Sequence, residues 1–177
     1  MDERNAAVPH DTEDKRWWLQ HGEILEARFV DLCRDRLRLD ARINPDKEHD
    51  PTVPDLVVEG ALADLKTQNT PFFTAGRYGL DPRFAVTFNR KDYERYKTLY
   101  PSLVVYFWLD WKQTEGFGSR VDYYGGIFRL PFPVLAQMIE HGAPEHTYKY
   151  RQGDTAGNAK SSFVLDVRKF EPLFIAD

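Results

Sequence analysis

The segment Val53–Gln68 constrains the fold of this chain most, because its pattern predicts a β-hairpin. Apolar residues on both sides are interrupted by Glu59 and Gly60, which predict a two-residue turn. A two-residue turn fixes the register in which the two strands pair, and this register places Asp55 opposite Asp64. The pairs nearer the turn are Val58 with Ala61, Val57 with Leu62, and Leu56 with Ala63. A three-residue turn would shift this register by one residue and move Asp55 to the other face.

The two-residue turn gathers polar side chains on one face of the hairpin. Side chains alternate between faces along a strand, so Asp64, Lys66 and Gln68 should share a face, with Asp55 beside them. Two carboxylates directly opposed across a hairpin repel each other unless a cation lies between them. Carboxylate oxygens are the ligands that hard divalent cations take, so the hairpin predicts a site for Mg²⁺ or Mn²⁺. Alternatively, both aspartates are surface acids and Lys66 is their salt-bridge partner.

These residues also resemble a known catalytic signature. Pro54-Asp55, followed after eight residues by Asp64-Leu65-Lys66, is similar to the active-site motif of the PD-(D/E)XK nuclease superfamily. The resemblance implies an α/β fold with a restriction-endonuclease-like αβββαβ core, in which a mixed central sheet is flanked by helices. It implies a metal-dependent nuclease that hydrolyses phosphodiester bonds, with DNA as the expected substrate. The metal would activate water and neutralise phosphoryl charge, and the lysine would stabilise developing negative charge or assist the attacking water.

Members of this superfamily often add a glutamate from the first helix, and Glu23 and Glu26 are the candidates. They lie three residues apart and so near one helix face. Glu26 ranks first, because its distance from Gly22 is similar to the Gly-x3-Glu start of several such nucleases. Acids are also common early in helices for reasons of the helix dipole, so either glutamate could instead be a solvated side chain.

The resemblance therefore implies a set of site residues. The implied catalytic residues are Asp55, Asp64, Lys66, Glu26 and Gln68, and the implied metal ligands are Asp55, Asp64, Glu26 and Glu23. Gln68 would position water or a base edge; alternatively, it makes a hydrogen bond at the end of its strand. Two other acid-x-Lys triplets, ending at Lys15 and Lys112, lack a Pro-Asp partner.

The remaining pattern predicts an alternation of helices and strands. The expected elements are a helix over 14–39, a strand over 42–44, the hairpin over 55–67, a strand over 83–88, a helix over 89–99, strands over 103–111 and 123–130, a helix over 131–140 and a strand over 162–170. The continuous apolar run over 103–111 is typical of a central strand. The first elements follow the order of the superfamily core, and the polar, basic segment 147–160 is a candidate nucleic-acid surface.

Composition narrows the classes of protein. A length of 177 residues suits one domain over 12–177, after a tail at 1–11. The single Cys33 excludes an internal disulfide framework and favours the reducing cytoplasm. The charged N-terminal segment predicts no secretory signal, and no apolar run is long enough to span a membrane.

The acidic balance of the chain leaves two function classes open. A net charge of −4 argues mildly against a protein that coats DNA, but a nuclease needs only a local basic patch. The alternative to a nuclease is a catalytically inactive protein of the same fold that binds nucleic acid or a protein partner. A homodimer is a further expectation, since cutting both strands of a duplex usually requires two active sites.

Overall fold

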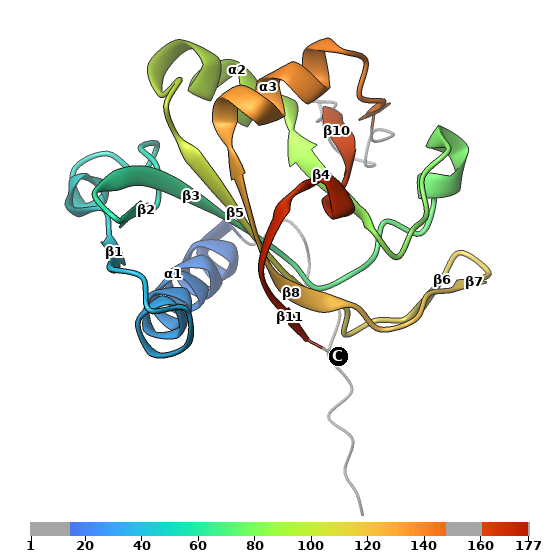
Figure 1. Cartoon of the computed structure of the whole chain (residues 1–177), viewed down its shortest axis with the longest axis horizontal. Coiled ribbons are helices and arrows are strands. Elements are labelled where there is room, and N and C mark those ends of the chain that lie inside the picture. Colours follow the sequence, from blue (N-terminus) through green and yellow to red (C-terminus); the bar gives the residue numbers. More distant parts are fainter. Residues whose placement is uncertain (1–14, 148–160, 177) are drawn as a thin grey trace, which may run out of the picture.

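The structure, a computed structural model, describes residues 15–147 and 161–176 and is built on a six-stranded mixed sheet (Figure 1). Its strands, in spatial order, are β1 (Ala41–Ile43), β2 (Leu56–Val58), β3 (Ala61–Gln68), β5 (Val104–Asp110), β8 (Gly125–Pro131) and β11 (Glu171–Ala176). β3 and β5 run parallel, and the other neighbours are antiparallel. The expected α/β class with a mixed central sheet is therefore confirmed. The expected tail at 1–11 lies outside the described residues.

Helices cover the large sheet on both faces. α1 (Lys15–Leu32) packs on one face, while α2 (Arg90–Leu99) and α3 (Phe132–Glu140) pack on the other (Figure 1). A smaller antiparallel sheet lies on the same side as α2 and α3, with the order β4 (Ala85–Asn89), β10 (Ser161–Asp166) and β9 (Glu145–Thr147). A short ribbon of β6 (Glu115–Gly116) and β7 (Ser119–Arg120) projects from the sheet. None of the helices within the described ranges has the length and apolar character needed to cross a membrane.

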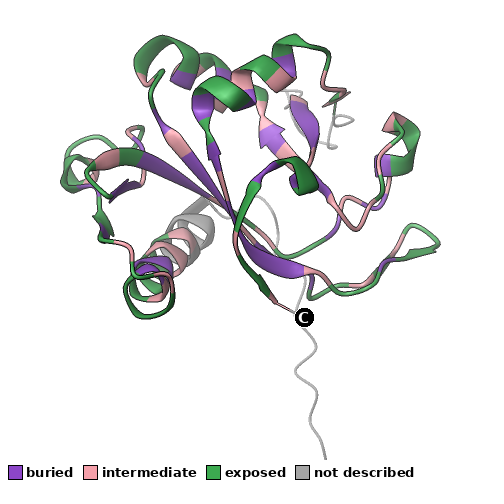
Figure 2. Ribbon diagram, viewed as in Figure 1, coloured by how far each residue is buried: buried purple, intermediate pink, exposed green. Residues whose placement is uncertain are grey.

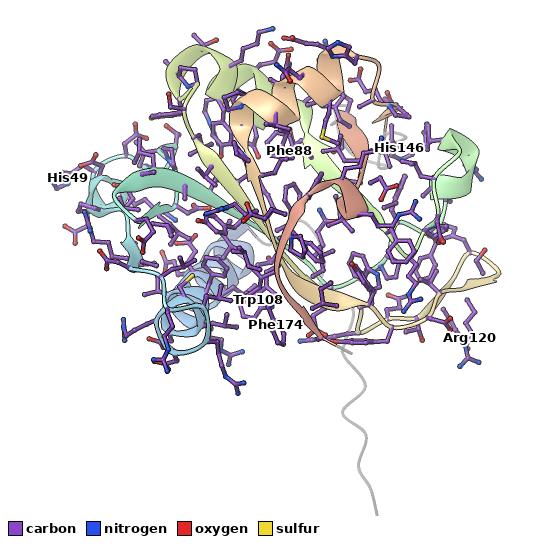
Figure 3. All side chains as sticks on the ribbon, viewed as in Figure 1. His49, Phe88, Trp108, Arg120, His146 and Phe174 are labelled. Atoms are coloured by element: carbon purple, nitrogen blue, oxygen red, sulfur yellow. The ribbon has the colours of Figure 1, made fainter. Side chains whose placement is uncertain are left out.

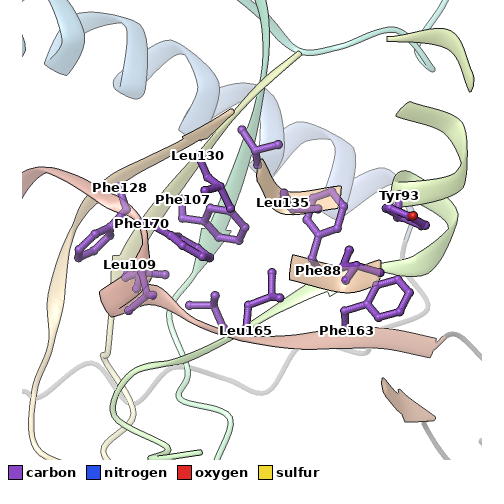
Figure 4. Close-up of a cluster of buried hydrophobic side chains, with 14 of the residues drawn as sticks. Phe88, Tyr93, Phe107, Leu109, Phe128, Leu130, Leu135, Phe163, Leu165 and Phe170 are labelled. Atoms are coloured by element: carbon purple, nitrogen blue, oxygen red, sulfur yellow. The ribbon is translucent and has the colours of Figure 1, made fainter. Parts of the chain in front are cut away.

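The alternation of side chains along β5 builds two separate cores. Phe107 enters the core under α2 and α3, whereas Tyr106 enters the smaller core under α1. Figure 4 shows the larger core, which is dominated by aromatic and leucine side chains. Figure 3 places Phe88 and Trp108 on opposite sides of the large sheet. Figure 2 shows that β5 is largely buried, so its expected central position is confirmed.

The hairpin adopts the predicted two-residue turn. β2 and β3 pair Val58 with Ala61, Val57 with Leu62 and Leu56 with Ala63. Glu59 and Gly60 have φ angles of 50° and 78°, as a turn that matches the twist of a hairpin requires. A positive φ is unusual for glutamate, but this residue is held in place by Asp40. The Glu59 amide donates to the Asp40 carbonyl at 2.7 Å, and the Asp40 amide donates to the Glu59 carboxylate at 2.5 Å.

Three expectations about element boundaries were wrong. In place of the helix expected over 14–39, the α-helix ends at Leu32 and one π-helical turn follows over Cys33–Leu37. Arg38, whose backbone is left-handed, ends this turn. The strand expected over 162–170 ends at Asp166, whose side chain accepts from the Arg168 amide and turns the chain into β11. β9 lies between 140 and 162, where the sequence predicts no strand, and it pairs with β10. The two differences in strands follow from pairing, since β9 and β10 lie in the smaller sheet and β11 in the larger one.

Candidate active site

The two strands of the hairpin separate at Asp55, and this separation creates the site. The carbonyl of Asp55 accepts a hydrogen bond at 2.9 Å from the Asn44 amide, next to β1. On the side of β3 away from β5, the amide of Leu65 then has no partner strand, and it donates instead to Asp55 Oδ2 at 3.3 Å. Because Pro54 has no amide hydrogen, the ladder cannot simply continue past this point. The Asp55 carboxylate thus takes the place of a backbone partner, at the edge of the hairpin.

A lysine outside the predicted set bridges Asp55 to the first helix. Lys47 Nζ lies 2.7 Å from Glu26 Oε1, 2.6 Å from Glu26 Oε2 and 2.8 Å from Asp55 Oδ1. The three side chains are mostly shielded, with exposed fractions of 12% for Glu26, 19% for Lys47 and 22% for Asp55. Burial alone would lower the pKa of Lys47, but hydrogen bonds to the two carboxylates outweigh burial and raise that pKa. Lys47 is therefore charged at neutral pH.

Asp64 is the most deeply buried acid of the site, with 3% of its surface exposed. Its Oδ1 accepts a hydrogen bond of 2.6 Å from the hydroxyl of Tyr96. Its Oδ2 forms an ion pair with the Lys66 ammonium at 2.7 Å. Burial raises the pKa of Asp64; the charge of Lys66 opposes this rise and the charge of Asp55 adds to it. Each carboxylate oxygen of Asp64 therefore has a partner, Tyr96 for Oδ1 and Lys66 for Oδ2.

Lys66 lies between two acids, one from its own strand and one from α2. Its Nζ is 2.7 Å from Asp64 Oδ2 and 2.7 Å from Asp92 Oδ2, and 23% of the side chain is exposed. The ammonium also lies 5.7 Å from the ring centre of Phe88 and 5.8 Å from that of Tyr96, within range of a cation–π attraction. Burial lowers the pKa of Lys66, but the neighbouring acids raise it well above its usual range.

The remaining predicted residues divide between the site and the surface. Glu26 belongs to the site because its carboxylate binds the Lys47 ammonium, whereas Glu23 is exposed on the surface. Gln68 shares the face of Lys66, but its amide is bound to the backbone of β4: Nε2 donates to the Thr87 carbonyl at 2.8 Å, and Oε1 accepts from the Thr87 amide at 3.4 Å. Gln68 thus joins the two sheets, as the strand-end alternative anticipated. Most of the candidate nucleic-acid surface, 148–160, lies outside the described residues.

Three residues of the site were not predicted from the sequence: Lys47, Asp92 and Tyr96. Asp92 and Tyr96 lie on one face of α2, where a spacing of four residues could have signalled a shared contact. Lys47 lies in a polar loop that carries no periodic signal.

We call the five charged residues near the point where β2 separates from β3 the hairpin site; they are Glu26, Lys47, Asp55, Asp64 and Lys66.

The hairpin site contains carboxylate oxygens, which hard divalent cations bind, but in this structure each of its carboxylates forms an ion pair with a lysine. Among residues 15–147 and 161–176, no three His, Cys, Asp or Glu side chains are grouped closely enough to hold a metal ion. One observation nevertheless fits such an ion: the Lys47 ammonium already lies as a cation between the carboxylates of Glu26 and Asp55. All of these donors are carboxylate oxygens, which suit Mg²⁺ or Mn²⁺.

Comparison with known proteins identifies no relative. No protein-family model, no curated protein and no solved structure matches the chain. The fold and the hairpin site are therefore the only observations that bear on function.

Proposed function

We propose that the protein is a metal-dependent nuclease of the PD-(D/E)XK type that hydrolyses phosphodiester bonds, with DNA as substrate. One observation supports this most: where β2 leaves β3, Asp55 is joined through Lys47 to Glu26 of α1, and Asp64 of β3 is paired with Lys66. The two groups lie close enough for the charge of Asp55 to act on Asp64. The order α1, β1, β2, β3, α2 and β5 is also consistent with a restriction-endonuclease-like core. In this proposal β4 is an insertion between β3 and α2.

Asp55, Asp64 and Glu26 would hold Mg²⁺ or Mn²⁺ in the proposed enzyme. The bound ion would supply Lewis-acid activation of water and charge neutralisation at the phosphate. Asp64 suits this role because its carboxylate is buried and already pairs with a positive charge, the Lys66 ammonium 2.7 Å from its Oδ2. Asp55 would contribute Oδ1, while its Oδ2 stays on the Leu65 amide and keeps the side chain oriented.

Lys66 would act as a fixed positive charge. The neighbouring acids raise its pKa well above its usual range, so the amine is protonated at neutral pH. A protonated ammonium in a shielded position stabilises negative charge that develops on a phosphoryl oxygen. Asp92 and the rings of Phe88 and Tyr96 hold the ammonium in place. Of the two roles that the sequence leaves open, we therefore favour transition-state stabilisation.

A second function has one specific observation in its favour. The acids of the hairpin site already have lysine partners, since Lys47 binds Glu26 and Asp55 while Lys66 binds Asp64. A protein of this fold that binds nucleic acid or a protein partner without cutting it would need no metal and could keep such pairs for stability. The titration of the protein with Mn²⁺ separates the two functions, because a non-catalytic scaffold takes up no ion at this site.

The nuclease proposal is tested by cleavage of duplex and single-stranded DNA in the presence of Mg²⁺. We expect Asp64→Asn to abolish cleavage, because the amide cannot replace the charge of the carboxylate on the metal. The chain offers a matched control in its other strand-borne acid-x-Lys triplet, where Asp110 is 43% exposed and lies 3.6 Å from Lys112. Asp110→Asn should cut like the wild type. Equal cleavage by wild type and Asp64→Asn would refute the proposal, as would the lack of cleavage by the wild type.

Two further aspects of the function are proposals of the same kind. A dimer would bring two hairpin sites to the two strands of a duplex. A cytoplasmic location is favoured by Cys33, which is buried and unpaired and so has no need of an oxidising compartment.

A further inference from the structure

Lys47 occupies the position in the hairpin site where a bound cation would be expected. Its ammonium has three hydrogens, and the structure gives it three carboxylate oxygens at 2.6 to 2.8 Å, two from Glu26 and one from Asp55. Two acids from distant parts of the chain are thus bridged by one positive charge. Bridging of this kind is what a divalent ion does between carboxylates.

The loop that carries Lys47 is fixed to the hairpin by the side chain of Asn44. Asn44 is 3% exposed; its Nδ2 donates to the Pro54 carbonyl at 2.8 Å, and its Oδ1 accepts from the Asp46 amide at 3.2 Å. The second bond caps the 3-10 turn Pro45–Glu48, on which Lys47 lies. Figure 3 shows His49, the residue after this turn, at the rim of the molecule. The backbone beneath Lys47 is therefore held rigidly against the segment that bears Asp55.

We propose that Lys47 is a built-in counter-ion that competes with the divalent cation for Glu26 and Asp55. This inference rests on the proposed function, since it concerns the same site. With no metal bound, the ammonium neutralises the two acids and stabilises their approach. When a divalent cation enters, the ammonium leaves the carboxylates, and its flexible four-carbon stem lets it swing to solvent while the backbone stays fixed. Lys47 thereby sets the cation concentration at which the site fills.

Removal of the Lys47 charge has two opposite consequences. Without metal, Glu26 and Asp55 lose their shared partner and repel each other, so the apo protein becomes less stable. With metal, no ammonium has to be displaced, so the cation binds more tightly. A purely structural lysine would produce the first effect without the second.

The test is isothermal titration of the whole chain with MnCl₂, for wild type, Lys47→Met and Lys47→Gln. We expect both variants to bind Mn²⁺ about tenfold more tightly than the wild type, an effect of about 1.4 kcal/mol. Lys97→Met is the matched control, because Lys97 is 52% exposed and pairs with Glu140 at 2.7 Å on the surface. It removes the same charge and should leave Mn²⁺ affinity unchanged. Circular dichroism establishes that each variant is folded, and Lys47→Gln preserves a polar side chain should Lys47→Met fail to fold.

Thermal unfolding provides a second readout that does not depend on catalysis. Lys47→Met and Lys47→Gln should melt below the wild type without metal, and saturating Mn²⁺ should raise their melting temperatures by more than it raises that of the wild type. If the wild type binds Mn²⁺ and the variants bind it no more tightly, the competition is refuted while the proposed function stands. If neither wild type nor variants bind Mn²⁺, both the inference and the metal-dependent function fail.

Discussion

Replacement of Lys66 by methionine tests how the hairpin site is held together. The substitution keeps the length of the side chain and removes the charge that faces Asp64 and Asp92. The side chain of Asp64 is 4% exposed. Loss of one partner from a buried ion pair costs about 3–5 kcal/mol, because the other charge stays buried without compensation. We expect the lower end, about 3 kcal/mol, since Lys66 is 23% exposed and Asp64 keeps the hydroxyl of Tyr96. For a chain of 177 residues this corresponds to a fall of about 6–12 °C in melting temperature.

The loss in stability should depend on pH in a defined direction. Burial already raises the pKa of Asp64, and removal of Lys66 takes away the charge that opposes this rise. In the unfolded chain an aspartate titrates near pH 4, so below that pH both states are protonated and the penalty is absent. As the pH rises from there toward the folded pKa, the unfolded state releases its proton first, and folding becomes less favourable. The destabilisation should therefore be larger at pH 7 than at pH 4.

Chemical denaturation at several pH values measures this difference directly. Lys112→Met is the control; Lys112 lies in the other triplet, is 71% exposed, and should change stability little at any pH. A loss of less than about 0.5 kcal/mol for Lys66→Met at pH 7, the range of an ordinary surface change, would refute the reasoning. A loss that is the same at pH 7 and pH 4 would also contradict it.

Three further substitutions have expected effects on stability, each measured by thermal or denaturant unfolding. Tyr96→Phe removes the 2.6 Å hydrogen bond to buried Asp64 and should cost about 1–3 kcal/mol; no loss would show that the carboxylate finds another donor. Asn44→Ala removes a buried bond to the Pro54 carbonyl and should cost a similar amount, about 1–3 kcal/mol, and an unchanged midpoint would contradict the anchoring of the Lys47 loop. Gly126→Ala places a Cβ 2.5 Å from a carbonyl oxygen of β11, so the variant should melt earlier; wild-type stability would mean that β11 shifts freely.

The hairpin could be predicted from the sequence because its signals are local. Two apolar runs and the turn residues Glu59 and Gly60 fix the register, and that register fixes which residues share a face with Lys66. The central strand β5 was predictable for the same reason, since a continuous apolar run signals burial on both faces. The helix predicted over 89–99 was recognisable for the same reason, and in the structure the Asn89 side chain caps it by accepting from the Lys91 amide at 2.8 Å.

The rest of the site depends on contacts between distant segments. Lys47 reaches Glu26 and Asp55 only because Asn44 anchors its loop, and no periodic pattern signals that contact. The orientation of Asp55 follows from the departure of β2 from β3, which turns its carboxylate to the Leu65 amide. The division of the segment after 161 into β10 and β11 is likewise set by pairing with two different sheets. Such tertiary effects override local preference.

Anomalous diffraction from crystals soaked in MnCl₂ tests most directly whether the hairpin site binds a divalent cation. We expect a peak at the hairpin site, within coordination distance of the Asp55 and Asp64 carboxylates and close to Glu26, with the Lys47 ammonium moved away from both Glu26 and Asp55. An absence of manganese there at saturating concentration, with Lys47 still between its two carboxylates, would show that the hairpin site is not a metal site.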